Sequence, residues 1–311
     1  MGEIAFVAVD WGTTSFRLWA MDADGGVISE RHGERGMSTL KPVDFEAVLE
    51  ESLTALKIHA KVPVVICGMA GAAQGWVEAP YVDLPTRLET IPTYAIQVPL
   101  ARRDVRILPG LAQRDAGMPD VMRGEETLLL GAALEKGVSG MVCLPGTHSK
   151  WVRIEASIVT GFATSMTGEI FDLLAHKSTL AHFICAPLGN LSDNPAFADA
   201  LKEAIHSPEK ILQLLFSVRA TPLVMGAKNA ANMAARLSGL LIGLEIAGMG
   251  QSTGDQVTLI SGGVLAQIYA RAFDIAGIEP RLLSADEMAR AGLLHAARLL
   301  WPEQLNRKHD T

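Results

Sequence analysis

The sequence predicts an α/β protein that is built from two similar halves. Apolar, β-rich runs alternate with helical segments along the chain, which is the pattern of layered α/β proteins. The order strand, short polar turn, strand, strand occurs twice, with a separation of roughly 140 residues, which indicates a structural duplication. Hydrophobic residues make up 49% of the 311 residues, enough for a large core. We therefore expect two domains, residues 1–137 and residues 138–311.

The first repeat opens the chain. Residues 4–9 are apolar and β-rich, and they end in the polar turn 10–15. Apolar and other side chains then alternate over residues 16–20, as in a strand, and the turn signal at 22–26 predicts a return strand at 27–30. A helix at 45–59, buried strands at 62–67 and 105–108, and a helix at 124–134 complete this half.

The second repeat begins with the apolar run 141–144, which ends in the turn 145–150. Strands follow at 151–154 and 158–162. Helices are expected at 169–175, 194–205, 208–218 and 229–246, then a strand at 257–260 and a helix at 264–276. Ser284 caps a final helix that runs to residue 300, with Glu287 at the capping-box position.

Composition excludes several classes of protein. The net charge of −7 gives no overall attraction to nucleic acid or to an anionic membrane. Arg236 and Glu245 interrupt the apolar stretch at 237–249, which argues against a membrane span. Cys67, Cys143 and Cys185 form no C-x-x-C pair, so reduced, buried thiols and a cytoplasmic location are expected. The start of the chain lacks a signal-peptide pattern. A homodimer is left open.

Two polar turns are candidate anion sites. Gly12, Thr13 and Thr14 follow the first strand, and Gly146-Thr147-His148-Ser149 follows its counterpart in the second half. Small residues let a phosphate approach the backbone, and amides and hydroxyls donate to its oxygens. Each turn could instead be an ordinary hairpin turn, but the matched pair could hold one polyphosphate between two domains. Neither a Walker loop nor a G-x-G-x-x-G pattern after a strand is present.

Three carboxylates lie where such a site could use them. Asp10 ends the first strand and could hold Mg²⁺, or could cap the turn that follows it. Glu125 and Glu126 open a helix, where their negative charge is favourable, and either could also act as a general base toward a substrate hydroxyl. Spacing alone does not choose between them, although Glu125 lies nearer to the strand end.

Several of these segments, taken together, resemble a known family. The segments 10–14, 145–151 and 261–263 resemble the two phosphate elements and the adenosine element of the sugar kinase, Hsp70 and actin superfamily. More narrowly, the sequence resembles the 2-dehydro-3-deoxygalactonokinase family, through the further segments 68–71, 75–76, 79–81, 109–110, 122–127, 166–169 and 238–243.

The resemblance implies a two-domain, actin-like ATPase (ribonuclease H-like) fold, with ATP and Mg²⁺ in an interdomain cleft. It implies phosphorylation of 2-dehydro-3-deoxy-D-galactonate at the 6-hydroxyl, with ATP and the sugar acid as the partners. The catalytic residues would be Asp10, which holds the metal, and Glu125 or Glu126. The residues expected to bind ATP are Gly12, Thr13, Thr14, Gly146, Thr147, His148, Lys150, Gly262 and Gly263. Those expected to bind the sugar acid are Arg17, Gly71, Gln74, Trp76, Arg123 and Ser149.

Other interpretations remain for individual residues and for the whole chain. Arg17 could face solvent, Trp76 could fill the core, His148 could cap its turn, and Lys150 could contact phosphate or substrate. The main alternative function is a kinase for another sugar or keto-deoxy acid, because a fold does not fix a substrate. A non-catalytic sugar sensor is a second. An acyl hydrolase that uses Ser149 and His148 is disfavoured, because adjacent strand residues point to opposite faces.

Overall fold

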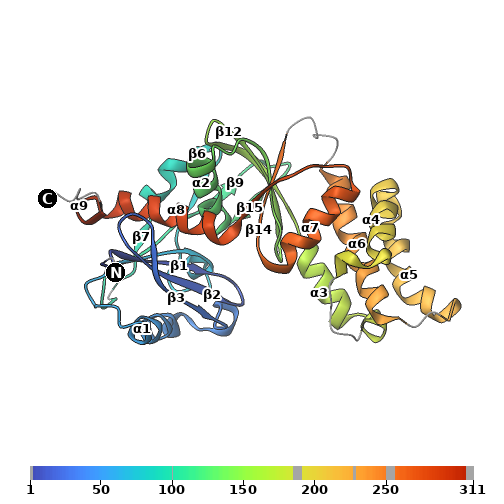
Figure 1. Cartoon of the computed structure of the whole chain (residues 1–311), viewed down its shortest axis with the longest axis horizontal. Helices are drawn as coiled ribbons and strands as arrows, with labels where there is room; N and C mark the ends of the chain where they lie inside the picture. Colours follow the sequence, from blue (N-terminus) through green and yellow to red (C-terminus); the bar gives the residue numbers. More distant parts are fainter. Residues whose placement is uncertain (1–2, 100, 185–190, 227–228, 250–255, 306–311) are drawn as a thin grey trace. The chain divides into compact units, whose positions relative to one another are not determined.

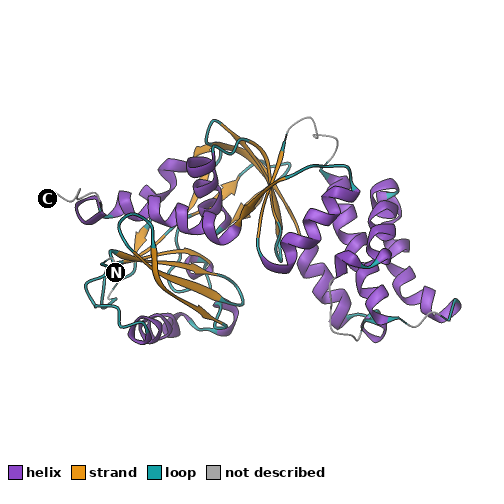
Figure 2. Ribbon diagram, in the orientation of Figure 1, coloured by secondary structure: helices purple, strands orange, loops and turns teal. Residues whose placement is uncertain are grey.

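The computed structural model describes residues 3–99, 101–184, 191–226, 229–249 and 256–305 (Figures 1 and 2). The chain divides into two compact units. Unit 1 comprises Met1–Ser139, Ile154–Phe162 and Ala285–Thr311, and unit 2 comprises Gly140–Arg153 and Ala163–Ser284. These units differ from the sequence-based division at residue 137 in two segments, because residues 154–162 and 285–311 belong to unit 1.

Unit 1 is organised around a mixed sheet whose strands lie in the order β3-β2-β1-β4-β8-β7. The pairs β1–β2 and β2–β3 are antiparallel, whereas β1, β4 and β8 run parallel. The strands of this sheet are β1 (Phe6–Trp11), β2 (Phe16–Met21), β3 (Val27–Gly33), β4 (Val64–Gly68), β7 (Ile96–Gln97) and β8 (Val105–Ile107). The carboxyl ends of β1 and β4 consequently lie side by side, with Asp10 in register with Cys67.

The two faces of this sheet bury different helices, because side chains alternate along a strand. Val7, Val9 and Trp11 of β1 pack in the core that contains Phe45 and Leu49 of α1 (Phe45–Ala55). Phe6 and Ala8, with the opposite orientation, pack in the core that contains α8 (Ala285–Leu300). Figure 1 shows α1 and α8 on opposite sides of β1–β3.

Helix α8 also packs closely against α2 (Glu125–Lys136). A Cβ atom added at Gly131 would lie 2.1 Å from the Met288 carbonyl oxygen, and one added at Gly292 would lie 2.0 Å from the Thr127 carbonyl oxygen. Only glycine permits the two backbones to come this near. This contact explains why the final helix joins unit 1 although it follows unit 2 in sequence.

A second sheet repeats the strand order of the first. It contains the order β13-β12-β11-β14-β15, which matches β3-β2-β1-β4-β8 position by position, and β11, β14 and β15 are again parallel. The strands β11, β14 and β15 belong to unit 2, whereas residues 154–162, in β12 and β13, are assigned to unit 1. These strands are β11 (Gly140–Leu144), β12 (Ser149–Glu155), β13 (Ile158–Ser165), β14 (Val257–Ser261) and β15 (Arg281–Ser284). The predicted duplication is confirmed, and the architecture is that of the actin-like ATPase fold.

Helices pack against this second sheet and against one another, as Figure 2 shows for the helical part of unit 2. They are α3 (Thr167–Lys177), α4 (Pro195–His206), α5 (Ile211–Val224), α6 (Ala230–Gly248) and α7 (Gly263–Ile275). Gly239 and Gly243 of α6 lie against the backbone of α4, as their virtual Cβ distances of 2.3 and 2.6 Å show. By length and composition α6 could cross a membrane, but 67% of its most apolar window is buried inside the protein.

Some elements differ from the sequence-based expectation. Helix α1 ends at Ala55 rather than at residue 59, because Lys57 adopts a positive φ of 57°. A three-stranded sheet, β10-β9-β5, was not predicted, and neither were β6 and β7. The strands of the small sheet are β5 (Tyr81–Asp83), β9 (Gly110–Gln113) and β10 (Asp120–Met122). The remaining short elements are β6 (Thr86–Arg87) and the helix α9 (Pro302–Leu305).

Candidate functional site

Unit 1 gathers carboxylates where β1 and β4 end and α2 begins. Asp10 lies at the end of β1, beside Cys67 of β4, whose Sγ lies 3.8 Å from Asp10 Oδ1. Burial raises the pKa of the Asp10 carboxyl, and the negative charges of Glu125 and Asp286 act in the same direction, against the opposing charge of Arg17. A cation bound at this carboxylate would relieve the cost of ionising it.

Glu126 is almost fully buried at the start of α2. Its Oε2 accepts a hydrogen bond from the Gly124 amide at 2.7 Å, and its Oε1 accepts one from Thr127 Oγ1 at 3.1 Å. Burial first, and then the neighbouring charge of Glu125, raises the pKa of Glu126 to about 8. Glu126 therefore holds a proton at neutral pH, and a residue already protonated is poorly suited to accept one.

Glu125 has a different environment, although it is adjacent in sequence. Its side chain is half-buried rather than enclosed, and its Oε2 accepts a hydrogen bond from the Arg123 amide at 3.1 Å. Of the two candidate bases, Glu125 is the better placed to meet a substrate. The sequence favoured Glu125 only because this residue lies nearer to the end of the preceding strand.

The first polar turn is held by a neighbouring loop. The Gly36, Met37 and Ser38 amides donate to the carbonyls of Thr14, Gly12 and Thr13, at 3.1, 3.0 and 2.9 Å. The side chains of Thr13, Thr14 and Ser15 are exposed. The turn thus has its carbonyls occupied and its hydroxyls accessible, which suits an anion better than a cation.

The second polar turn, in unit 2, packs on the start of α3. The Glu169 amide donates to the Thr147 carbonyl at 3.0 Å, and Glu169 Oε2 lies 2.6 Å from His148 Nε2. Thr147 and His148 are exposed, whereas Lys150 is buried and its Nζ donates to the His148 carbonyl at 2.9 Å. Lys150 therefore stabilises the turn from within.

Ser149 requires a correction. It was expected to bind the sugar acid, but its side chain is completely buried and Oγ donates to Glu245 Oε1 at 2.7 Å. A hydroxyl enclosed in this way contacts no substrate. The same burial removes the hydrolase interpretation, since His148 faces Glu169 instead of Ser149.

An apolar pocket of about 220 Å³ adjoins the second turn within unit 2. Gly146 belongs to both the turn and the pocket wall, so a ligand in the pocket could extend directly to the turn. Sequence reasoning placed Gly262 and Gly263 near a nucleoside but missed most of the wall. The lining residues are Gly146, Thr167, Gly168, Phe171, Leu191, Ser238, Leu241, Ile242, Val264, Leu265, Ile268 and Tyr269.

Gly262 and Gly263 precede the pocket wall that is formed by the first turn of α7. An added Cβ at either position would meet no atom within 4 Å, so both border open space, and Gly263 has a positive φ of 56°. The structure thus places the predicted adenosine element beside Val264 and Leu265 of the pocket. An apolar slot beside an exposed polar turn is the arrangement expected for a flat heterocycle with a charged tail.

Arg123 is the most unusual cation of unit 1. It is 8% exposed, its guanidinium lies 4.2 Å from the centre of the Tyr81 ring, and Nη2 donates to the Ala79 carbonyl at 2.8 Å. Nε and Nη1 are buried, and among the described residues no side chain or carbonyl accepts a hydrogen bond from them. A buried guanidinium with unused donors favours a bound carboxylate.

The other residues predicted to bind substrate in unit 1 have mixed surroundings. Gly71 is buried near Arg123, whose Nη1 lies 3.0 Å from its virtual Cβ, and Gln74 is exposed. Arg17 is paired with Asp286, and the two side chains are 40% and 43% exposed. Trp76 packs against the core beside Phe45, with ring centroids 6.2 Å apart, so it acts chiefly as a core residue.

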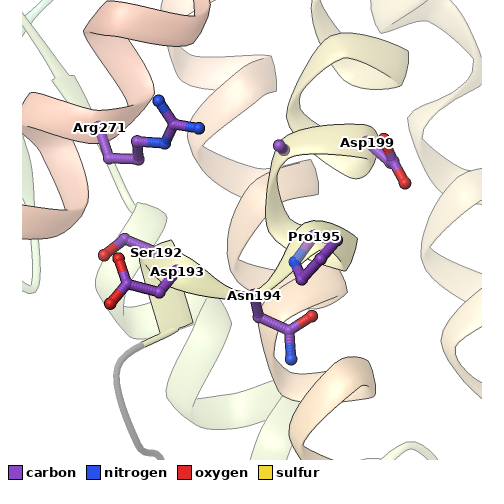
Figure 3. A pocket seen from close by; sticks show the side chains of 7 residues that line it. Ser192, Asp193, Asn194, Pro195, Asp199 and Arg271 are labelled. Carbon is purple, nitrogen blue, oxygen red and sulfur yellow. The ribbon is translucent and has the colours of Figure 1, made fainter.

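Unit 2 has another cavity of about 410 Å³, at the start of α4 (Figure 3). Asp193, Asn194 and Asp199 line it from one side, and Arg271 reaches it from α7. None of the residues predicted from the sequence lines it, so it is separate from the candidate nucleotide pocket.

Comparisons with known proteins decide the family. Residues 10–296 match the family described as 2-keto-3-deoxy-galactonokinase. The chain belongs to this family. The matched span includes both polar turns, Glu125, Glu126, Arg123 and the α7 segment.

Individual relatives agree with this assignment. The chain is 48% identical over 96% of its length to "Probable 2-dehydro-3-deoxygalactonokinase DgoK1" of Rhizobium meliloti, of which it covers 98%. It is 35% identical over 93% of its length to the 2-dehydro-3-deoxygalactonokinase of Escherichia coli, of which it covers 96%.

Two solved structures are also similar. One is the crystal structure of a Sinorhizobium meliloti protein described as a 2-dehydro-3-deoxygalactonokinase, with a TM-score of 0.89, 48% identity, and coverage of 96% of this chain and 99% of the other. The other is the activator of a 2-hydroxyisocaproyl-CoA dehydratase from Clostridium difficile, with a TM-score of 0.51, 13% identity, and coverage of 98% and 97%. At this identity, the second likeness shows the fold alone.

Proposed function

We propose that the protein transfers the γ-phosphoryl group of ATP to the 6-hydroxyl of 2-dehydro-3-deoxy-D-galactonate, giving the 6-phosphate and ADP. The observation that carries this proposal is membership of the 2-keto-3-deoxy-galactonokinase family over residues 10–296. The galactonokinases of Rhizobium meliloti and Escherichia coli are matched over nearly their whole lengths, which supports the same reaction for this chain. We propose the cytoplasm as its location, where ATP is available and the buried thiols of Cys67 and Cys143 stay reduced.

The nucleotide would bind in unit 2. In the proposal, the adenine ring enters the apolar pocket, and its phosphates meet the turn that contains Gly146 and Thr147. The turn of unit 1 at Gly12, Thr13 and Thr14 is a second candidate phosphate-binding element. Its accessible hydroxyls and occupied carbonyls support this role.

Mg²⁺ fits the residues that are present. It typically takes one or two protein carboxylates and completes its shell with water and phosphate oxygens. Asp10 supplies one such carboxylate, and the described residues contain no group of three or more ligating side chains that could hold a metal by themselves. When bound, the metal would neutralise charge on the transferring phosphoryl group.

The acceptor hydroxyl requires a base and an anchor. Glu125 would accept the proton of the 6-hydroxyl, because its side chain is half-buried and accessible, whereas Glu126 is enclosed and its pKa is raised to about 8. Arg123 would hold the substrate carboxylate through Nε and Nη1, the two donors that lack acceptors among the described residues. Gly71 packs directly against that guanidinium, because an added Cβ would lie 3.0 Å from Nη1.

A coupled ADP-release assay tests the proposal. The purified protein is offered ATP with a panel of sugar acids, keto-deoxy acids and neutral sugars. Turnover that is fastest with 2-dehydro-3-deoxy-D-galactonate supports the assignment. A faster reaction with another acid would replace the substrate but keep the kinase activity, and ATP turnover with no compound on the panel would overturn the proposal in favour of a sugar sensor.

A further inference from the structure

Unit 2 contains a buried carboxylate that the reaction does not use directly. Glu245 lies in the last turn of α6, is 5% exposed, and does not line the apolar pocket. Burying a charged group is costly unless several hydrogen bonds replace its water. The role of Glu245 can therefore be inferred from the groups that donate hydrogen bonds to its carboxylate.

Four donors from three other elements converge on this carboxylate. Oε1 accepts hydrogen bonds from Ser149 Oγ at 2.7 Å and from Trp151 Nε1 at 2.8 Å, both from β12. Oε2 accepts from Tyr269 OH of α7 at 2.8 Å and from Thr167 Oγ1, which belongs to the first residue of α3. All four donor side chains are buried, so the hydrogen bonds to Glu245 replace most of the water that its carboxylate would otherwise bind.

Three of the four donors belong to parts of the candidate nucleotide site. Ser149 is the last residue of the second polar turn, and Thr167 and Tyr269 both line the apolar pocket. Next to Thr167, Gly168 lies so close to the turn that an added Cβ would be 2.5 Å from the Gly146 carbonyl oxygen. The Glu245 carboxylate thus connects the turn that would bind phosphate with two walls of the pocket that would hold the adenine ring.

The chemistry of the donors restricts what could replace Glu245. Trp151 Nε1 can only donate, so an oxygen must face it. In a glutamine the amide nitrogen would then face Thr167 and Tyr269, whose hydroxyls would have to turn and accept. Glutamine therefore keeps the size of the side chain but reverses two of the four hydrogen bonds. This makes it a sharp test of the carboxylate itself.

We propose that Glu245 is a positioning residue for nucleotide binding: through Ser149, Thr167 and Tyr269 it sets the spacing between the phosphate turn and the apolar pocket. The inference rests on the proposed function, because it takes the pocket to be the site of the nucleotide base. It adds a residue that contacts no ligand but determines whether ATP fits.

The test compares Glu245→Gln with a control on the same helix. Arg236→Gln removes the ion pair between Arg236 Nη2 and Glu203 Oε2, 2.7 Å apart, which lies outside the pocket lining. For each protein we would measure the dissociation constant of ATP by calorimetry, the melting temperature, and KM for ATP and for the sugar acid. Glu245→Gln should weaken ATP binding by about tenfold, while KM for the sugar acid changes by less than about twofold.

The outcomes separate positioning from simple stability. Arg236→Gln should lower the melting temperature and leave ATP binding unchanged. If Glu245→Gln also lowers the melting temperature without weakening ATP binding, the inference is wrong and the proposed function stands. If the wild-type protein itself does not bind ATP, both are wrong.

A second variant tests the inference if Glu245→Gln does not fold. Tyr269→Phe keeps the ring and removes one donor to Glu245, so it should weaken ATP binding in the same direction by about threefold. Unchanged ATP binding in Tyr269→Phe, with Glu245→Gln unfolded, would overturn the inference.

Discussion

Replacing Glu126 with glutamine should stabilise the protein above neutral pH. The pKa of Glu126 is about 8 in the folded protein against an ordinary 4.5, so folding favours the protonated carboxyl. The resulting stability is fully present below pH 4.5 and is lost as the pH rises through the folded pKa. Each pH unit within that window costs about 1.4 kcal/mol, so at pH 7 the wild-type protein has lost about 3 kcal/mol that Glu126→Gln keeps.

The side chain of glutamine suits this position. Its oxygen can accept from the Gly124 amide, as Glu126 Oε2 does at 2.7 Å, and its amide can donate to Thr127 Oγ1, which lies 3.1 Å from the other oxygen. The hydrogen bond from the Gly124 amide is therefore retained, and the one with Thr127 is kept with its direction reversed, because the Thr127 hydroxyl then accepts. The variant differs from the wild type chiefly in being unable to ionise.

Scanning calorimetry at about pH 5 and about pH 8 measures the effect, with the transition of unit 1 followed separately if the two units unfold independently. The control is Glu135→Gln, at an exposed position of the same helix. The difference in stability between this variant and the wild type should be the same at both pH values. The stability gained by Glu126→Gln should grow with pH. A gain that is equal at both pH values, or a loss that grows with pH, would show that Glu126 is ionised in the folded protein and would refute the reasoning.

Three further predictions concern catalysis. Glu125→Gln should lower kcat by about 10²–10⁴-fold while ATP still binds, because only the proton acceptor is lost, and calorimetric ATP binding alongside turnover checks both; near-normal kcat would exclude Glu125 as the base. Asp10→Asn should abolish the turnover that Mg²⁺ supports, measured by titrating the metal in the activity assay. A titration curve identical to that of the wild type would remove Asp10 from the metal site. Arg123→Ala should raise KM for the sugar acid by at least about tenfold and leave KM for ATP nearly unchanged, whereas equal increases would indicate a phosphate contact.

Much of the fold followed from local patterns. The two strand–turn–strand–strand repeats were visible because alternation and polar turns are properties of neighbouring residues. The small sheet β10-β9-β5 was missed because β5 and β10 contain only three residues each, too few to establish a period. The place of α8 in unit 1 depends on the contact of Gly131 and Gly292 with distant backbone, which no local pattern encodes.

The candidate site was predicted unevenly for a similar reason. Asp10, the two turns and the Glu125–Glu126 pair stand at strand or helix ends, where sequence gives both residue type and position. The apolar pocket was not predicted, since Leu241, Ile242 and Ile268 look like any core residues of a helix until the fold leaves a space beside them. The segment 238–243 was noticed as part of the family resemblance, and its Gly239 and Gly243 pack against the backbone of α4. Ser149 was expected to bind substrate only through the family resemblance, and its side chain is buried.

The division of the chain has a consequence for dissecting the protein. The backbone passes between the two units at 139/140, 153/154, 162/163 and 284/285. A single protease cut at any one of these crossings leaves three covalent connections intact, so limited digestion with one nick will not release either half. A fragment that stops at residue 139 would lack the helix that covers Gly131 and would expose that glycine-lined face to solvent. Unit 1 is therefore complete only when the chain continues through residues 285–300, which follow unit 2 in sequence.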